Sequence, residues 1–123
     1  MQELQSRLLV WNYTEAEKSR LDAILRQIDA PPAMTVEPGQ GRMKVRDIIE
    51  GKRAEGDPLV SDEKVILFYE VPHKGVLFLM KFFKQTDLPK PIYAIVTEHS
   101  IEWSFHELLE HLVEERDRME GKA

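Results

Sequence analysis

Two histidines near the C-terminus have the residue types of a zinc-protease motif but not its spacing. His106 and Glu107 are followed by His111, whereas that chemistry needs two histidines one helical turn apart. Histidines five positions apart diverge by about 140° around a helix, and the chain has no cysteine to complete a metal site. We therefore expect no metal, and expect surface pairs of His106 with Glu110 and of Glu107 with His111.

A glycine motif, Gly39-Gln40-Gly41, precedes a second candidate helix, where free backbone N–H groups can bind phosphate. It lacks the third glycine of a dinucleotide loop and the lysine of a P-loop, and a tight turn accounts for both glycines. The segment 42–53 that follows is locally basic, which is typical of a solvated surface. We expect no cofactor.

Polar residues lie at the C-terminal ends of two of the predicted strands. Asn12, Tyr13 and Thr14 lie at the end of the first strand, and Glu70 and His73 lie at the end of the third. If these two strands lie side by side and parallel, the residues line the crevice in which open α/β sheets bind ligands. Glu70 and His73 would be the acid and base there, but no nucleophile accompanies them. The pattern indicates a ligand site and favours a protein that is not an enzyme.

The elements that position these residues occur twice in the order strand, helix, strand, helix. The first half has a strand at 8–13, a helix at 15–28 that begins at a Thr14–Glu17 capping box, a strand at 33–36, a turn at 38–41 and a helix at 43–50. The second half has a strand at 65–71, helices at 72–86 and 105–118, and a strand at 92–97. At offsets of about 58 and then 60 positions the halves share residue types, for example Leu9 with Leu67, which predicts an internal repeat of 8–51 and 65–118 joined by the connector 52–64.

The alternation of strands and helices predicts one small α/β domain over residues 1–123. We expect a four-stranded, mostly parallel sheet of order 2-1-3-4 with helices on both faces. In this arrangement all four strands are parallel, including those that begin at Leu8 and Val65. The helices at 43–50 and 72–86 then share one face of the sheet.

The second half contains two stretches that point to a family. Residues 91–97 read Pro-Ile-Tyr-Ala-Ile-Val-Thr, and residues 100–104 read Ser-Ile-Glu-Trp-Ser. They resemble the C-terminal signature of an uncharacterised prokaryotic family, a domain of unknown function, and Trp11-Asn12-Tyr13 extends the resemblance to the first half. The resemblance implies no activity. Residues 75–78 depart from it, because they are apolar where the family is expected to have an acidic, polar helical turn.

Charge and hydropathy predict the compartment of the protein and whether it binds nucleic acid or a membrane. The formal net charge is −5, which opposes the electrostatic attraction that dominates nucleic-acid binding. No apolar run approaches the length of about 20 residues that a membrane helix needs, and the N-terminus does not resemble a secretory signal. We therefore expect a cytoplasmic protein that binds neither nucleic acid nor a membrane.

The helix at 72–86 carries apolar residues outside its core stripe, namely Leu77, Phe78 and Met80, where the first helix has polar residues. Leu77 falls opposite Leu79 on the helix, in the middle of lysines. Because exposed apolar patches mark interfaces, this helix predicts a homodimer.

Two classes of function follow from the sequence. The first is a non-catalytic interaction or regulatory module that self-associates. The alternative is a small-ligand or nucleotide-binding protein, or a minor enzyme, that uses the strand ends near Asn12 and His73. A small molecule that copurifies with the protein and is detected by mass spectrometry would favour the second class.

Overall fold

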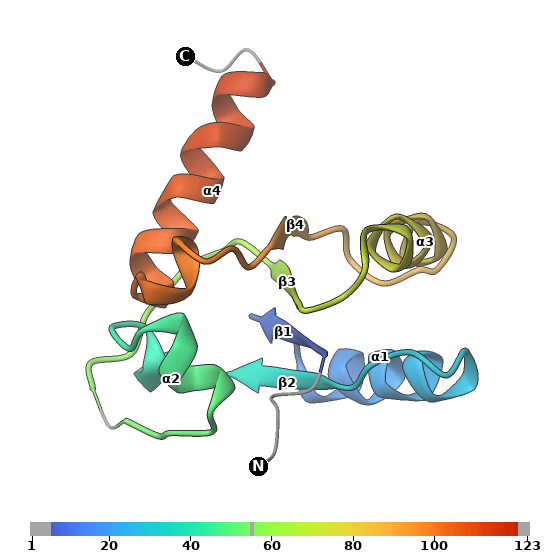
Figure 1. Ribbon diagram of the computed structural model, residues 1–123, viewed down its shortest axis with the longest axis horizontal. Coiled ribbons are helices and arrows are strands. Elements are labelled where there is room, and N and C mark those ends of the chain that lie inside the picture. Colours follow the sequence, from blue (N-terminus) through green and yellow to red (C-terminus); the bar gives the residue numbers. More distant parts are fainter. Residues whose placement is uncertain (1–5, 55, 121–123) are drawn as a thin grey trace.

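The order of elements along the chain is the predicted one (Figure 1). The computed structural model describes residues 6–54 and 56–120. In chain order the elements are β1 (Arg7–Trp11), α1 (Glu15–Gln27), β2 (Ala33–Val36), α2 (Val45–Ile49), β3 (Val65–Tyr69), α3 (His73–Lys84), β4 (Ile92–Ile95) and α4 (Phe105–Met119). Two 3-10 turns, Pro38–Gln40 and Ser100–Glu102, precede α2 and α4. The capping box that starts α1 is confirmed, with both Thr14 and Glu17 accepting a backbone N–H.

The sheet is four-stranded and mixed, and its order β2-β1-β3-β4 is the predicted one. β1 pairs with β2, and β3 with β4, in parallel, whereas β1 and β3 pair in antiparallel orientation. The expectation of four parallel strands was therefore wrong at the central pair. The right-handed crossover rule constrains each strand-helix-strand unit separately, and it does not determine how the two units meet.

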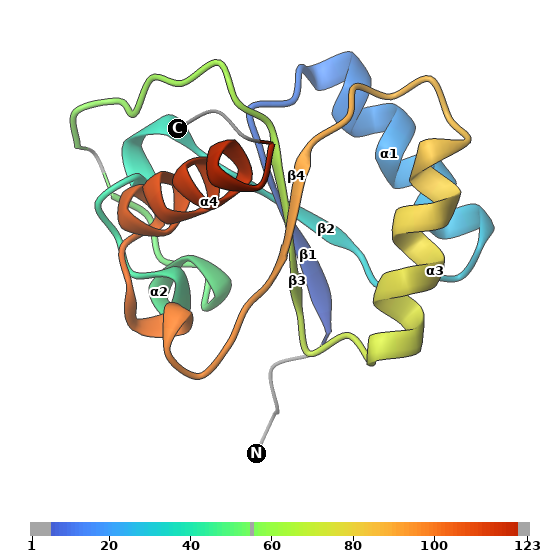
Figure 2. The ribbon, with the colours of Figure 1, turned by 90° about the horizontal axis from the view of Figure 1, so that it is seen from above.

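The antiparallel central pair also changes which helices share a face. α1 and α3 pack on one face of the sheet, and α2 and α4 pack on the other (Figure 2). The expectation that the helices at 43–50 and 72–86 share a face was wrong for the same reason. Turning one unit by 180° about an axis that lies in the plane of the sheet, perpendicular to the strands, keeps its crossover right-handed but reverses its strands and moves its helices to the opposite faces.

The two halves lie about an approximate two-fold axis perpendicular to the sheet. In the centre of the β1–β3 pair Leu9 lies opposite Leu67, the residue 58 positions later. A second antiparallel bridge joins Lys44 to Ser104, 60 positions later, where α2 and α4 begin. At both of these backbone pairings, residues at the offsets found in the sequence therefore meet one another. The common origin of the halves stays a prediction.

Each hydrophobic core draws on both halves of the chain. On one face, Leu21 and Leu25 of α1 share a buried cluster with Leu79 and Phe83 of α3. On the other face, the apolar residues of α2 and the first turns of α4 pack together against the sheet. The C-terminal part of α4 extends beyond this core (Figure 1).

Candidate functional site

Asn12, Tyr13 and Thr14 lie where the sequence places them, directly after β1. Asn12 has a left-handed backbone, with φ of 70°. Its side-chain amide donates to the carbonyl oxygens of Ser61 (2.7 Å) and Glu63 (2.9 Å). Asn12 therefore ties the connector to the end of β1, and Thr14 serves as the N-cap of α1.

Glu70 and His73 lie at the opposite end of the central strand pair. Because β1 and β3 are antiparallel, Trp11 lies opposite Val65, whereas Tyr69 lies opposite Arg7. The structure therefore does not bring Glu70 and His73 to Asn12, and the crevice expected between them does not form. The prediction depended on parallel central strands, which would have put both sets of residues at one edge.

A cavity of about 360 Å³ does lie beside Asn12. It is bounded by the ends of β1 and β2 and by the connector, and among the described residues Glu37 is the one charged residue in its wall. Trp11 also borders it and is only 3% exposed. In the described part of the chain the Trp11 indole Nε1–H has no hydrogen-bond partner. An unpaired buried donor destabilises the folded state, since such a group keeps no water contact.

The glycines of the Gly39-Gln40-Gly41 motif have a structural explanation. A Cβ on Gly39 would lie 2.9 Å from the carbonyl oxygen of Ala54, and one on Gly41 would lie 2.8 Å from the Cβ of Leu59. Both glycines thus allow the connector to approach the turn closely.

The basic segment 42–53 is partly neutralised by acidic side chains, since Lys44 and Arg46 both contact Glu102.

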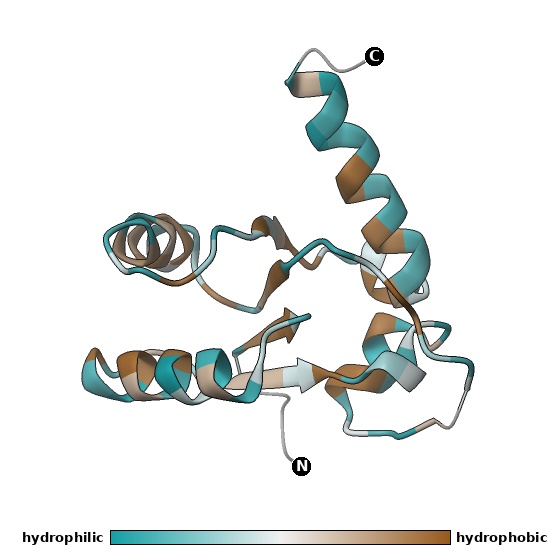
Figure 3. Cartoon of the chain, turned by 180° about the vertical axis from the view of Figure 1, so that it is seen from behind, coloured by the Kyte–Doolittle hydropathy of each residue, from teal (hydrophilic) through white to brown (hydrophobic). Residues whose placement is uncertain are grey.

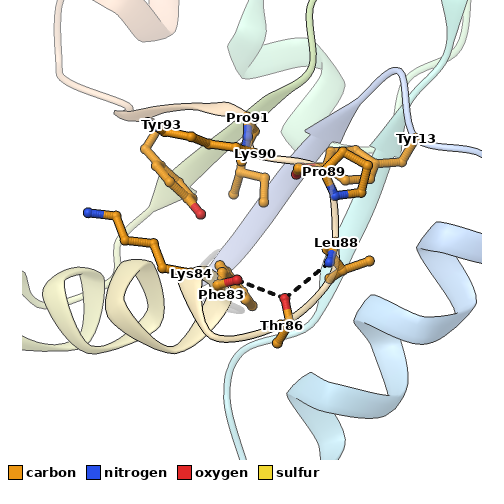
Figure 4. A pocket seen from close by; sticks show the side chains of 10 residues that line it. Tyr13, Phe83, Lys84, Thr86, Leu88, Pro89, Lys90, Pro91 and Tyr93 are labelled. Carbon is orange, nitrogen blue, oxygen red and sulfur yellow. Dashed lines mark hydrogen bonds between the residues drawn. The ribbon is translucent and has the colours of Figure 1, made fainter.

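A second cavity, of about 130 Å³, lies between the end of α3, the loop 86–91 and β4 (Figure 4). Tyr13 reaches it from the β1 side and donates its hydroxyl to the carbonyl oxygen of Pro89 at 3.3 Å. Tyr93 points its hydroxyl into the cavity from β4, and Lys84 runs alongside it (Figure 4). Tyr13 was identified as a candidate site residue from the sequence, whereas Tyr93 and Lys84 were not, because residues of distant segments meet here only in the folded chain.

Burial extends the pH range over which the phenols of the two tyrosines are neutral. Burial raises the pKa of Tyr13 well above its ordinary value, and the neighbouring Tyr93 and Glu17 add to the shift. Burial also raises the pKa of Tyr93. Both phenols therefore stay neutral and act as hydrogen-bond donors at physiological pH. Lys64 lies 5.0 Å from the centre of the Tyr13 ring and pairs with Glu17 at 3.2 Å.

The outer side of α3 exposes large apolar side chains. Leu77 is 53% exposed and Phe78 is 55% exposed, whereas Met80 is partly buried in the core beneath the helix. Figure 3 shows that the ribbon of α3 is more hydrophobic than that of α1. Of the three candidate interface residues, Leu77 and Phe78 are accordingly the two that a partner can reach.

Lysines without an acidic partner gather on the same helix and in the loop that follows it. Lysines 18, 44, 52 and 64 each form an ion pair. Among the described residues, the lysines that form none are all found between positions 74 and 90, and they are Lys74, Lys81, Lys84 and Lys90. A signal for this surface was present in the sequence, because residues 73–86 contain no Asp or Glu.

The histidines of α4 do not point to one ion. His106 pairs with Glu110 at 3.2 Å, as expected, whereas His111 stacks on Trp103 with the ring centres 4.7 Å apart. Residues 6–54 and 56–120 contain no group of three or more side chains that could hold a metal ion.

In the same residues, no helix is both long enough and apolar enough to cross a membrane.

Together these features define a small α/β domain with a mixed sheet, cavities beside Asn12 and Tyr93, and a basic, apolar surface on α3. A domain of unknown function, DUF3783, covers residues 64–119, which is the half that contains β3, α3, β4 and α4. The signature at 91–104 lies inside this range, so the resemblance to a domain of unknown function is confirmed there. Trp11-Asn12-Tyr13 lies outside the matched residues. Comparison with curated proteins and with solved structures found no match.

Proposed function

We propose that this protein is a non-catalytic docking module that binds an acidic, amphipathic segment of a partner protein through α3. We call the five exposed residues of this surface the docking face: Lys74, Leu77, Phe78, Lys81 and Lys84. The observation that carries the proposal is that lysines without an ion pair surround two exposed apolar side chains. Paired lysines elsewhere on the chain have their charge neutralised, whereas these remain available to a partner.

The composition of the docking face defines the chemistry of its occupant. At 100° per residue its five positions fall on one side of α3, with Leu77 between Lys81 and Lys84. A partner helix with apolar residues on one stripe and carboxylates beside it would cover Leu77 and Phe78 while it pairs with the lysines. Burial of the exposed half of these two side chains is worth roughly 1.5–3 kcal/mol in total.

Self-association through the same face, the outcome expected from the sequence, is the second candidate. The exposure of Leu77 and Phe78 favours it. However, a symmetric dimer centred on Leu77 would place three lysines of one copy against three of the other. Such like-charge contacts oppose association, so an acidic partner fits the face better.

A synthetic probe tests the proposal directly. The probe is a labelled 15-residue helical peptide with leucines along one stripe and glutamates elsewhere, and its binding is followed by fluorescence anisotropy. We expect the Leu77→Ser, Phe78→Ser double variant and the Lys81→Glu variant each to weaken binding by about tenfold. The matched control is Lys44→Glu, which makes the same charge change far from α3 and should leave binding unchanged.

Salt separates the two candidates. Binding of the acidic peptide should weaken between about 50 and 300 mM salt, whereas a lysine-lined homodimer should strengthen, because salt screens both attraction and repulsion. Equal binding of a control peptide with lysine in place of glutamate would contradict the proposal. So would binding to anionic vesicles at protein concentrations at which the peptide does not bind.

A further inference from the structure

We infer that the cavity between α3 and β4 binds a small carboxylic acid with a short apolar body. The inference does not depend on the docking face, although Lys84 belongs to both surfaces. It comes from the donors, charges and volume of the cavity. The cavity is drawn in Figure 4.

Of the three hydroxyls that the described residues bring to the cavity, one has no hydrogen-bond partner. The hydroxyls of Tyr13 and Thr86 already donate to the carbonyl oxygens of Pro89 and Phe83. Within the described residues the Tyr93 hydroxyl has no hydrogen-bond partner, and it points into the cavity (Figure 4). The free O–H is suited to a ligand that carries an acceptor.

The charges around the cavity select an anion. Lys84 and Lys90 are the charged residues of its wall, and neither forms an ion pair in the part of the chain that the structure describes. A carboxylate can accept a hydrogen bond from Tyr93 and pair with one of these ammonium groups, whereas an amine would be repelled. The Tyr93 phenol is neutral at physiological pH, and burial raises its pKa further, so it adds no negative charge to the site.

The remaining walls and the volume limit the body of the ligand. Ile66, Phe83 and Leu88 provide apolar walls, and Pro89 and Pro91 have no backbone N–H to offer. The volume of about 130 Å³ is close to that of an apolar cavity of about 150 Å³ that holds one benzene molecule. The ligand class is therefore a carboxylic acid with one ring or a branched chain of similar size.

Three fluorinated probes of one shape test the charge requirement. Binding of 4-fluorobenzoate, 4-fluorobenzamide and 4-fluorobenzylamine to the full chain is measured by ¹⁹F NMR titration. We expect the benzoate to bind with a dissociation constant on the order of millimolar, as suits so small a ligand. The neutral amide should bind about tenfold more weakly, and the amine should not bind. Equal binding of benzoate and benzamide, or no binding of benzoate at about 20 mM, would overturn the inference.

Variants locate the site. Tyr93→Phe removes one hydroxyl and keeps the ring stacked on Phe83, so it should weaken benzoate binding about tenfold while the circular dichroism spectrum stays the same. The Lys84→Gln, Lys90→Gln double variant should weaken it similarly. The control Lys74→Gln removes a charge from the same helix outside the cavity, and an equal loss there would show non-specific attraction and refute the site. The Leu77→Ser, Phe78→Ser variant should lose peptide docking but keep benzoate binding, which separates the two proposals.

Discussion

At the scale of single residues, Asn12 and Glu70 occupy equivalent positions in the two halves, but their side chains make different contacts. Both have a left-handed backbone, with φ of 70° and 55°, and they follow the two central strands. Asparagine tolerates this conformation, and the side-chain amide of Asn12 donates two hydrogen bonds to the connector. Glu70 has the same backbone strain, and in the described structure its side chain forms no ion pair.

Replacement of each residue by glycine should therefore have different effects on stability. We expect Asn12→Gly to lower the free energy of unfolding by about 1–2 kcal/mol, because two hydrogen bonds to the connector are lost. Glu70→Gly should leave it unchanged or raise it by up to about 1 kcal/mol, because relief of strain offsets the greater entropy of the unfolded chain. Urea unfolding measures both. Asn12→Asp, which lacks the donating N–H groups, is the control and should be as destabilising as Asn12→Gly. Equal effects of the two glycine variants would contradict this account.

At the scale of elements, α1 and α4 begin with similar sequences but different caps. In α1 the carboxylate of Glu17 accepts the backbone N–H of Thr14 at 2.9 Å and contacts Lys64 at 3.2 Å. In α4 the hydroxyl of Ser104 accepts the N–H of Glu107, which is half of a reciprocal capping box. The hydrogen bond from Thr14 and the pair with Lys64 lower the pKa of Glu17.

A lowered pKa in the folded state predicts a pH dependence with a definite sign. The contribution of Glu17 to stability is present above the ordinary carboxyl pKa and is lost as the pH falls through the lowered value. We expect Glu17→Gln to destabilise the protein by roughly 0.5–1 kcal/mol at pH 7, an amount reduced by partial exposure, and by less at pH 3. The control is Glu107→Gln at the same position of α4, which should have a smaller effect at pH 7. Thermal unfolding across this pH range provides the comparison, and a Glu17→Gln effect that grows on acidification would contradict it.

At the scale of the whole molecule, neither half has a hydrophobic core of its own. α1 needs α3 to complete one buried cluster, α2 needs α4 to complete the other, and β1 pairs with β3 between them. The halves should therefore unfold together, although the matched domain of unknown function covers only the second one.

The two tryptophans report separately on the halves, since Trp11 is in β1 and Trp103 precedes α4. We expect the Trp11 fluorescence of a Trp103→Phe variant, and the Trp103 fluorescence of a Trp11→Phe variant, to change at the same temperature as the circular dichroism of that variant. Leu21→Ala or Leu79→Ala, added to either background, should lower stability by about 2–5 kcal/mol and shift both signals together. A fluorescence change that precedes the loss of helix would mean that the halves unfold independently.

The sequence by itself determined the helices and strands and their order along the chain, because these depend on local patterns. Apolar residues at helical spacing placed Leu21 and Leu25 on the buried side of α1, and Thr14 marked where that helix begins. The candidate dimer surface also followed from sequence, since Leu77 lies opposite Leu79 on any regular helix.

Only the tertiary structure decided the relative direction of β1 and β3. Both strands are buried on both faces, so their continuous apolar runs suit a neighbour of either direction. That one choice placed Asn12 and Glu70 at opposite ends of the sheet and set α1 beside α3. It also determined which distant residues meet, since Tyr13 and Tyr93 reach one cavity only when the end of β1 lies beside the start of β3. Patterns local to one segment carry no information about such contacts.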